Sequence, residues 1–150
     1  MPDAPPPRPG SGTRPRTGRV LIVDDDARSA AAMVAVLADH LEVTVLADAA
    51  EAVARIAGGA RFDVVLCDLT MRAMNGAEIF ARVCAASARQ ASRIVFLGAG
   101  TMPLKLAEFL SRVPNPCLQH PIDVRVLRAL VDRRVAEEIA RGAPESAKSG

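Results

Sequence analysis

The sequence predicts an α/β fold, a doubly wound sheet of five parallel strands with helices on both faces. Short apolar, largely β-branched runs alternate along the chain with segments whose apolar residues recur at helical spacing, a pattern typical of consecutive βα units. Runs that are apolar throughout indicate strands buried on both faces, as in parallel sheets. Right-handed crossovers then favour the strand order 2-1-3-4-5, with its switch point between the first and third strands.

The expected strands are the short apolar runs themselves. They cover residues 20–23, 42–46, 64–67, 94–97 and 117–118. Glycines end the fourth run and prolines flank the fifth, as turns require.

The expected helices follow these strands. They cover residues 28–40, 49–57 and 77–86, a segment that begins at Pro103, and a last helix from about Asp123 to Arg141. Asp26 and Asp48 are suited to cap the first two helices, because their side chains can accept hydrogen bonds from free backbone N–H groups. Gly58-Gly59 is suited to end the second helix.

Composition divides the chain into three parts. Residues 1–18 are rich in Pro, Gly, Arg, Ser and Thr and are expected to be a disordered tail. Residues 19–132 form a single expected domain, long enough to bury a core. Residues 133–150 hold the charged end of the last helix and, from about residue 142, an expected disordered C-terminal tail.

Charge and hydropathy argue against several classes of function. The formal net charge of +2 is too small to favour nucleic acid or a membrane surface as a partner. No apolar run approaches the roughly 18 residues of a membrane span. The N-terminus has prolines and arginines where a signal peptide needs an apolar stretch. We therefore expect a cytoplasmic protein.

The three cysteines, Cys67, Cys84 and Cys117, lie far apart, each inside an apolar stretch. Their odd number and the lack of a C-x-x-C pair argue against a zinc site or a redox dithiol. We expect buried, reduced thiols, with Cys84 turned toward the core beside Ile79 and Val83.

Aspartates follow two of the expected strands, at the point where each strand ends. Asp24-Asp25-Asp26 comes directly after residues 20–23, and Asp68 comes directly after residues 64–67. The carboxyl ends of strands one and three meet at the switch point, where α/β sheets bind their ligands. Carboxylates gathered there repel one another unless a cation lies among them. Mg²⁺ prefers oxygen ligands and acts together with phosphates, so the pattern predicts phosphate chemistry.

Four segments stand in a specific order and spacing. They are Val20–Asp26, Phe62–Met71, Asn75-Gly76 and His120-Pro121. Together they resemble the first strand with its acidic pair, the phospho-acceptor strand and loop, the turn before the third helix and the Lys-Pro pair of bacterial two-component receiver domains. The resemblance to response regulators covers roughly Arg19 to Asp132. It implies a flavodoxin-like receiver fold, in which the bond before the proline is normally cis.

The resemblance also implies roles for single residues. Asp68 would accept a phosphoryl group from a phosphohistidine of a sensor histidine kinase or a phosphotransfer protein. Asp24, Asp25 and Asp68 would hold Mg²⁺, with the backbone carbonyl of Thr70 as a further ligand. A receiver of this kind catalyses at most its own phosphorylation, so no turnover of a separate substrate is expected.

Four departures from the family's pattern concern the switch around the acids. Gly98 stands where the family has Ser or Thr, so Gly98 and Ala99 would form a phosphoryl pocket without a side-chain hydroxyl. His120 replaces the lysine that pairs with the phosphoryl group, and Cys117 replaces an aromatic residue on the fifth strand. Arg72 replaces a proline, which is the mildest change.

Two interpretations therefore stay open. The three acids favour a single-domain receiver in a phosphorelay, with His120 compensating in part for the lysine. The loss of hydroxyl, lysine and aromatic ring together favours a pseudo-receiver, a docking module that does not depend on phosphorylation. A metal-dependent phosphatase with an aspartyl nucleophile is disfavoured, because Thr70 stands where a second Asp would act as general acid.

Fewer than 20 residues follow the expected domain, too few for a DNA-binding or enzymatic output domain. We therefore expect the signal to pass to a downstream protein. By the resemblance, the face formed by the helices that begin at Pro103 and Asp123 is the docking surface or a homodimer surface. Leu104, Lys105 and Arg112 are the contacts expected there.

Overall fold

The computed structural model describes residues 16–149, with side chains up to residue 142. Its core is one sheet of five parallel strands in the order β2-β1-β3-β4-β5. The strands are β1 (Arg19–Val23), β2 (Glu42–Leu46), β3 (Val64–Asp68), β4 (Ile94–Gly98) and β5 (Cys117–Gln119). The predicted fold class and strand order are confirmed, with strand ends within one residue of those expected.

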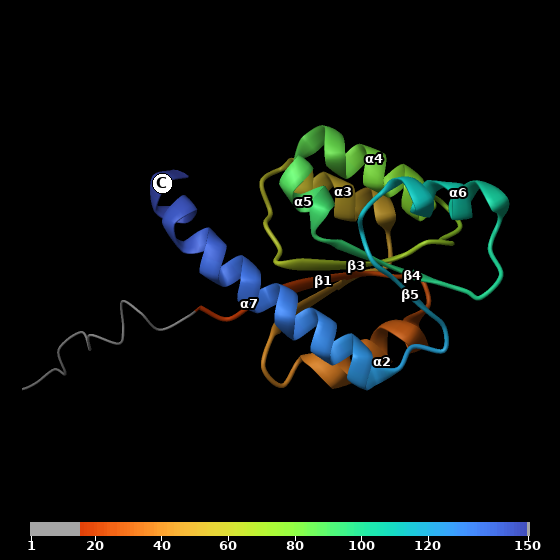
Figure 1. Ribbon diagram of the computed structural model, residues 1–150, viewed down its shortest axis with the longest axis horizontal. Coiled ribbons are helices and arrows are strands. Elements are labelled where there is room, and N and C mark those ends of the chain that lie inside the picture. The colour runs from red at the N-terminus through yellow and green to blue at the C-terminus, as the bar shows by residue number, and fades with distance from the viewer. Residues whose placement is uncertain (1–15, 150) are drawn as a thin grey trace, which may run out of the picture.

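Helices cover both faces of the sheet (Figure 1). On one face lie α2 (Ala27–Leu37) and α7 (Val124–Ser149). On the other lie α3 (Ala49–Ala57), α4 (Gly76–Ala86), α5 (Ala88–Ser92) and α6 (Leu104–Arg112). Successive strand residues alternate between two separate cores, so Ile22 packs toward α2 and α7 while Val23 packs toward the opposite layer. Burial on both faces fixes the strand ends that carry the site.

Side-chain caps begin the helices near the site. The Asp26 carboxylate accepts hydrogen bonds from Arg28 N and Ser29 N, and that of Asp48 accepts them from Ala50 N and Glu51 N. Both caps were predicted. Helix α2 ends at Leu37, three residues before the predicted end at His40. The cause is a tight turn in which His40 N and Leu41 N both donate to Leu37 O.

The short helix α5 was not predicted, because tertiary contacts define it. Its Gln90 is fully buried. The Gln90 amide accepts from Phe62 N at 3.0 Å and donates to Phe62 O at 3.1 Å. A two-way bond of this kind, to a residue far away in the sequence, leaves no trace in hydrophobic periodicity.

The cysteine prediction was correct for Cys67 and wrong for Cys84. Cys67 is buried and Cys117 is half-buried, but Cys84 is exposed. Helix α4 faces the sheet with Ile79 and Val83, and the residue after Val83 points about 100° away around the helix.

Both ends of the described chain differ from the expected boundaries. Residues 16–18 were assigned to the N-terminal tail, yet Arg16 pairs with Asp63 and Gly18 is buried beneath α7. A Cβ atom on Gly18 would lie 2.3 Å from Val135 Cγ1, so glycine lets α7 pass closely there. Helix α7 continues to Ser149 rather than ending near Arg141, in a stretch that holds the helix formers Ala, Glu and Lys but also Gly142 and Pro144, which disfavour a helix interior. The rest of the expected N-terminal tail lies outside the described residues.

None of the described helices combines the length and the apolar character needed to cross a membrane.

Candidate functional site

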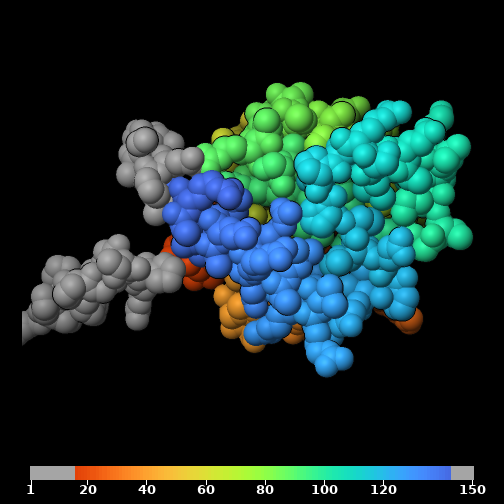
Figure 2. Space-filling view, in the orientation of Figure 1, coloured from red at the N-terminus to blue at the C-terminus, as the bar shows by residue number. Residues whose placement is uncertain are grey.

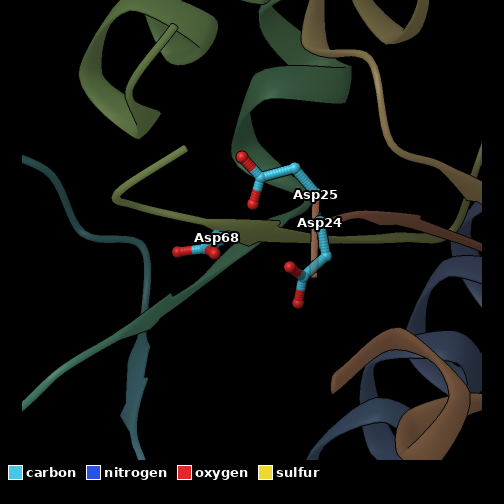
Figure 3. Close-up of side chains that lie close together, drawn as sticks. All are labelled: Asp24, Asp25 and Asp68. Carbon is cyan, nitrogen blue, oxygen red and sulfur yellow. The ribbon is translucent and has the colours of Figure 1, made fainter. Parts of the chain in front are cut away.

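Three carboxylates meet at the carboxyl edge of the sheet. Asp24 and Asp25 follow β1, and Asp68 ends β3, the strand next to β1. Each offers an oxygen within 4.8 Å of the others, and no further group of metal-ligating side chains is found among the described residues. Figure 3 shows Asp24 and Asp25 leaving opposite sides of the chain after β1, with Asp68 beside them. The structure thus brings together the three acids predicted from the sequence.

Asp24 is the buried member of this group, with 2% of its surface exposed. Its Oδ1 accepts a hydrogen bond from Asp26 N at 2.9 Å, whereas Oδ2 is buried and meets no donor. Burial raises the pKa of Asp24 most, and the charges of Asp68 and Asp26 raise it further, while hydrogen bonding by Asp26 N and Ser29 lowers it by less. A buried carboxylate oxygen without a donor is costly, and a cation is a partner that would satisfy it. The donor set, all oxygen, fits a hard divalent cation.

Asp68 is half-buried and is held by the residue two positions later. Its Oδ1 accepts from Thr70 N at 2.9 Å and from Thr70 Oγ1 at 3.2 Å. From the sequence, Thr70 was expected to act only as a metal ligand, through its backbone carbonyl. The sequence does carry a signal for these bonds, because an aspartate often accepts a hydrogen bond from the backbone N–H two residues later. These bonds leave Oδ2 of Asp68 as the oxygen that Thr70 does not hold.

Asp25 is exposed, and it accepts a hydrogen bond from Arg72 N at 3.3 Å. Proline, the residue that the family often has at this position, lacks a backbone N–H and could not make this bond. The mildest departure seen in the sequence therefore ties the loop after β3 to one of the acids.

Gly98 lies at the end of β4, as predicted, but the space beside it is not open. A Cβ atom there would lie 3.0 Å from Leu69 Cδ1, 3.2 Å from Met102 Cε and 3.5 Å from Cys117 Sγ. Leu69 is fully buried and packs still more closely on Gly76, where an added Cβ would lie 2.7 Å from Leu69 Cδ2. A Ser or Thr side chain at this position would therefore press on Leu69 and Met102, and these neighbours would have to shift slightly to admit it.

His120 is exposed and is fixed through its backbone. Its N–H donates to Gly98 O at 2.7 Å, and the bond to Pro121 is cis, as the family resemblance implied. Its imidazole makes no hydrogen bond or ion pair with any described residue. Cys117 is half-buried beside Gly98, and burial raises the pKa of its thiol.

An apolar groove opens beside the acids, between α2 and the end of β2. Its volume is about 500 Å³, and its lining is made of small side chains with Asp24 and Asp25 at one end. The apolar lining residues are Ala27, Ala30, Ala31, Val34, Ala35, Val45 and Ala47. Val45 is 41% exposed, so the groove is open to a binding partner.

The sheet order and the acids at the ends of β1 and β3 define the class, a receiver-type α/β domain. The sequence matches the response regulator receiver domain family over residues 20–132. That match spans most of the chain, and the protein belongs to this family. No curated protein matches the sequence.

Solved structures agree on the fold. The CheY-like receiver domain protein of Methanospirillum hungatei JF-1 is 23% identical with a TM-score of 0.72, over 85% of this chain and 100% of that one. A receiver domain protein of Clostridium thermocellum is 18% identical with a TM-score of 0.69, over 81% and 96%. An adenylate cyclase structure from Rhodopirellula baltica is 23% identical with a TM-score of 0.70, over 90% and 100%. At these identities the likeness concerns the fold alone.

Proposed function

We propose that this protein is a phosphorelay receiver that accepts a phosphoryl group on Asp68 with Mg²⁺ as cofactor. The observation that carries the proposal is the group of Asp24, Asp25 and Asp68, whose oxygens lie within 4.8 Å of one another. The buried, unpartnered Oδ2 of Asp24 supports a cation among them. An acidic group with structural duties only would be expected to have its buried oxygens paired.

Mg²⁺ would be held by the three carboxylates and the carbonyl of Thr70. When bound, the ion supplies positive charge that offsets the repulsion between Asp68 and the oxygens of an incoming phosphoryl group. The chain's own residues orient the nucleophile, because Thr70 N and Oγ1 both hold Oδ1 of Asp68. The pKa of Asp24 is raised first by burial and then by the charge of Asp68.

In the proposed step, a carboxylate oxygen of Asp68 attacks the phosphorus of a phosphohistidine. The new O–P bond forms as the P–N bond breaks, and the electron pair of that bond stays on the donor's imidazole nitrogen. The product on Asp68 is an acyl phosphate. No other group of the chain needs to gain or lose a proton in this transfer.

The phosphoryl donor must bring its phosphorus to Asp68. Receiver domains interact with histidine kinases or phosphotransfer proteins, and the groove between α2 and β2 is where we place such a donor. It starts at Asp24 and Asp25 and is lined by alanine and valine, so another helix can approach α2 closely. The downstream protein would bind at α6 and the start of α7, where Leu104 is 73% and Val126 is 49% exposed. A homodimer through that face is the other use we propose for it.

The alternative, a pseudo-receiver that docks partners without phosphate, is favoured by the packing at Gly98. A Cβ atom at position 98 would lie 3.0 Å from Leu69 Cδ1 and 3.2 Å from Met102 Cε, and the His120 imidazole forms no hydrogen bond or ion pair with the acids. Under this hypothesis the same α6 and α7 face binds its partner constitutively.

The experiment that tests the proposal is incubation with Mg²⁺ and acetyl phosphate, followed by intact-mass measurement. We expect the mass of one added phosphoryl group, which hydroxylamine removes because it cleaves acyl phosphates. Asp68→Ala should show no adduct. Asp26→Asn is the matched control, because Asp26 is a neighbouring exposed acid that caps α2, and asparagine caps equally well. Its adduct should equal that of the wild-type protein.

An unmodified mass for the wild-type protein, or an adduct that survives Asp68→Ala, would contradict the proposal. If the adduct forms, amide hydrogen exchange across α6 then separates the two functions. A receiver that signals should change its exchange rates at residues 104–112 on phosphorylation. Unchanged rates there would favour the docking module.

A further inference from the structure

His40 lies between the end of α2 and α7, away from the acidic site. Its Nδ1 lies 2.5 Å from Asp39 Oδ1, and its Nε2 lies 2.6 Å from Asp132 Oδ1 on α7. The ring is about one-third exposed, at 32%. In the space-filling view, the orange surface, which belongs to α2 and the turn after it, lies directly against α7 (blue) (Figure 2).

This geometry suits only one protonation state of the ring. A neutral imidazole carries one N–H and one lone pair, whereas an imidazolium donates from both nitrogens. Ionised carboxylates have only lone pairs to offer. In a neutral His40, the nitrogen without a proton would face a carboxylate oxygen of Asp39 or Asp132, and the two lone pairs would repel each other. Only the imidazolium can donate a hydrogen bond to both carboxylates.

Arg128 completes the cluster from α7. Its Nη1 donates to Val36 O at 2.7 Å, in the last turn of α2, and its Nη1 and Nη2 lie 3.3 Å from the two oxygens of Asp39. Its Nε lies 3.8 Å from Asp132 Oδ2. Two carboxylates and one guanidinium face His40, so the cluster has a net negative charge until the ring is protonated.

The electrostatics agree with the geometry. The hydrogen bond to Asp132, followed by that to Asp39, raises the pKa of His40 above its ordinary value. Partial burial of the ring and the charge of Arg128 act in the opposite direction but are outweighed. The pKa of Asp39 is lowered by His40 first and by Arg128 next.

We propose that His40, Asp39, Asp132 and Arg128 form a pH-dependent clamp that holds the end of α2 to α7 while the His40 ring carries protons on both nitrogens. Loss of one proton removes one of the two bonds and loosens the clamp. Helix α2 begins at the acidic site, and α7 begins just after His120-Pro121. The clamp therefore joins the C-terminal end of α2 to α7, away from the acidic site at which α2 begins.

The sign of the pH effect follows from linkage. Because the folded-state pKa of His40 is raised, the clamp's contribution is complete below the ordinary histidine value of about 6.5. It is lost as the pH rises through the folded-state value. The apolar core that includes Leu127 and Val131 holds α7 at every pH, so we expect local opening at the junction rather than unfolding.

Titration of the histidine ring protons by NMR tests the first half of the proposal. The chain has two histidines, His40 and His120, and His40→Gln assigns the signals. We expect the His40 midpoint above about 6.5 and a downward shift in Asp132→Asn. Glu51→Gln is the matched control, because it removes an exposed carboxylate paired with Arg55 on α3, and it should leave the midpoint unchanged. A wild-type midpoint at or below the ordinary value overturns the clamp.

Amide hydrogen exchange tests the second half. After correction for intrinsic pH dependence, exchange at residues 128–135 should accelerate as the pH passes the His40 midpoint. The upper limit is about tenfold for each unit by which that midpoint exceeds the unfolded value. Salt should reduce the effect, because the groups are partly exposed. In His40→Gln the corrected rates should not depend on pH. A pH profile that is the same in both proteins, or flat in the wild type, overturns the clamp.

Discussion

An aspartate is buried at each end of the central strands. One of these carboxylates is fully paired with protein donors, whereas the other has an oxygen without a donor. Before β3, Asp63 is 3% exposed; it accepts from Arg16 Nη1 and Nη2 at 2.8 and 2.7 Å and from Arg19 N at 2.8 Å. After β1, Asp24 is 2% exposed, has a donor for only one oxygen, and lies beside two more acids.

The pKa values of the two aspartates shift in opposite directions for this reason. Burial would raise the pKa of Asp63, but the Arg16 hydrogen bonds, the Arg19 N–H and nearby positive charge lower it overall. Burial raises the pKa of Asp24, and the lowering effects of Asp26 N and of the Ser29 side chain do not offset it. A buried acid with a structural role has its partners in the chain. One without them marks the place where a partner from outside the chain is expected.

The paired end extends to α7. Arg93 and Glu138 form an ion pair at 2.5 Å with about one-tenth of each side chain exposed, and Arg141 bonds Glu138 at 2.9 Å. Ion pairs thus join the N-terminal lead-in to the residue before β3, and the residue before β4 to α7. At the opposite edge of the sheet, Asp24, Asp25 and Asp68 lie close together, and none of them forms an ion pair with a described residue. We derive four predictions from this contrast, in order of decreasing effect.

The largest effect is expected from Asp63→Asn. It should lower the free energy of unfolding by about 2 to 3 kcal/mol, because charged hydrogen bonds from Arg16 and Arg19 are lost. The same change at the other end, Asp24→Asn, should cost less than about 1 kcal/mol without divalent cations, since it removes an unpaired buried charge. Urea unfolding with a chelator present measures both. Equal losses would mean that the two ends do not differ.

The contribution of Asp63 should depend on pH. Its folded-state pKa is lowered, so its contribution is present above the unfolded value of about 3.9 and fades as the pH falls through the folded-state value. The difference in unfolding free energy between the wild type and Asp63→Asn should therefore be constant near neutrality and shrink in acid. Urea titrations from pH 7 downward check this. A difference that grows in acid would contradict it.

Mg²⁺ should raise the free energy of unfolding by binding at the Asp24 end of the sheet, where the carboxylates lack protein partners. At ten times its dissociation constant, a ligand specific to the folded state adds about 1.4 kcal/mol. We expect this gain in the wild type and in Asp63→Asn, and its loss in Asp24→Asn. Urea unfolding with MgCl₂, against NaCl of equal ionic strength, is the measurement. The same gain in Asp24→Asn would place the ion elsewhere.

The smallest effect is expected from Arg72→Pro. It removes the N–H that holds Asp25 and should weaken Mg²⁺ binding, by less than about tenfold because the bond is exposed and 3.3 Å long. Arg72→Ala keeps the N–H and is the matched control. Calorimetric titration with MgCl₂ compares them. If the alanine variant binds as weakly as the proline variant, the guanidinium rather than the N–H supports the site.

The fold could be predicted from the sequence because strands that are buried on both faces consist of apolar residues throughout, as residues 20–23 and 94–97 do. The acids of the site could be predicted because strand order brings the ends of β1 and β3 together. What could not be predicted depends on contacts across the fold. Helix α5 is held in place by the hydrogen bonds of Gln90 to Phe62. Arg16 belongs to the folded domain rather than to the expected tail because it pairs with Asp63. The Arg72 N–H reaches Asp25 only once β1 and β3 are adjacent.

The position of Leu69 between Gly76 and Gly98 has a consequence for how this sequence can change. A serine or threonine at Gly98 meets Leu69 Cδ1 at 3.0 Å and Met102 Cε at 3.2 Å from its first carbon. Methionine can turn aside, but Leu69 is enclosed and has little room to do so. Introducing a hydroxyl at position 98 by single substitutions therefore has a preferred order. A smaller side chain at Leu69 comes first, and the substitution of Gly98 follows. The mutational path to a hydroxyl at this position is thus longer than one substitution.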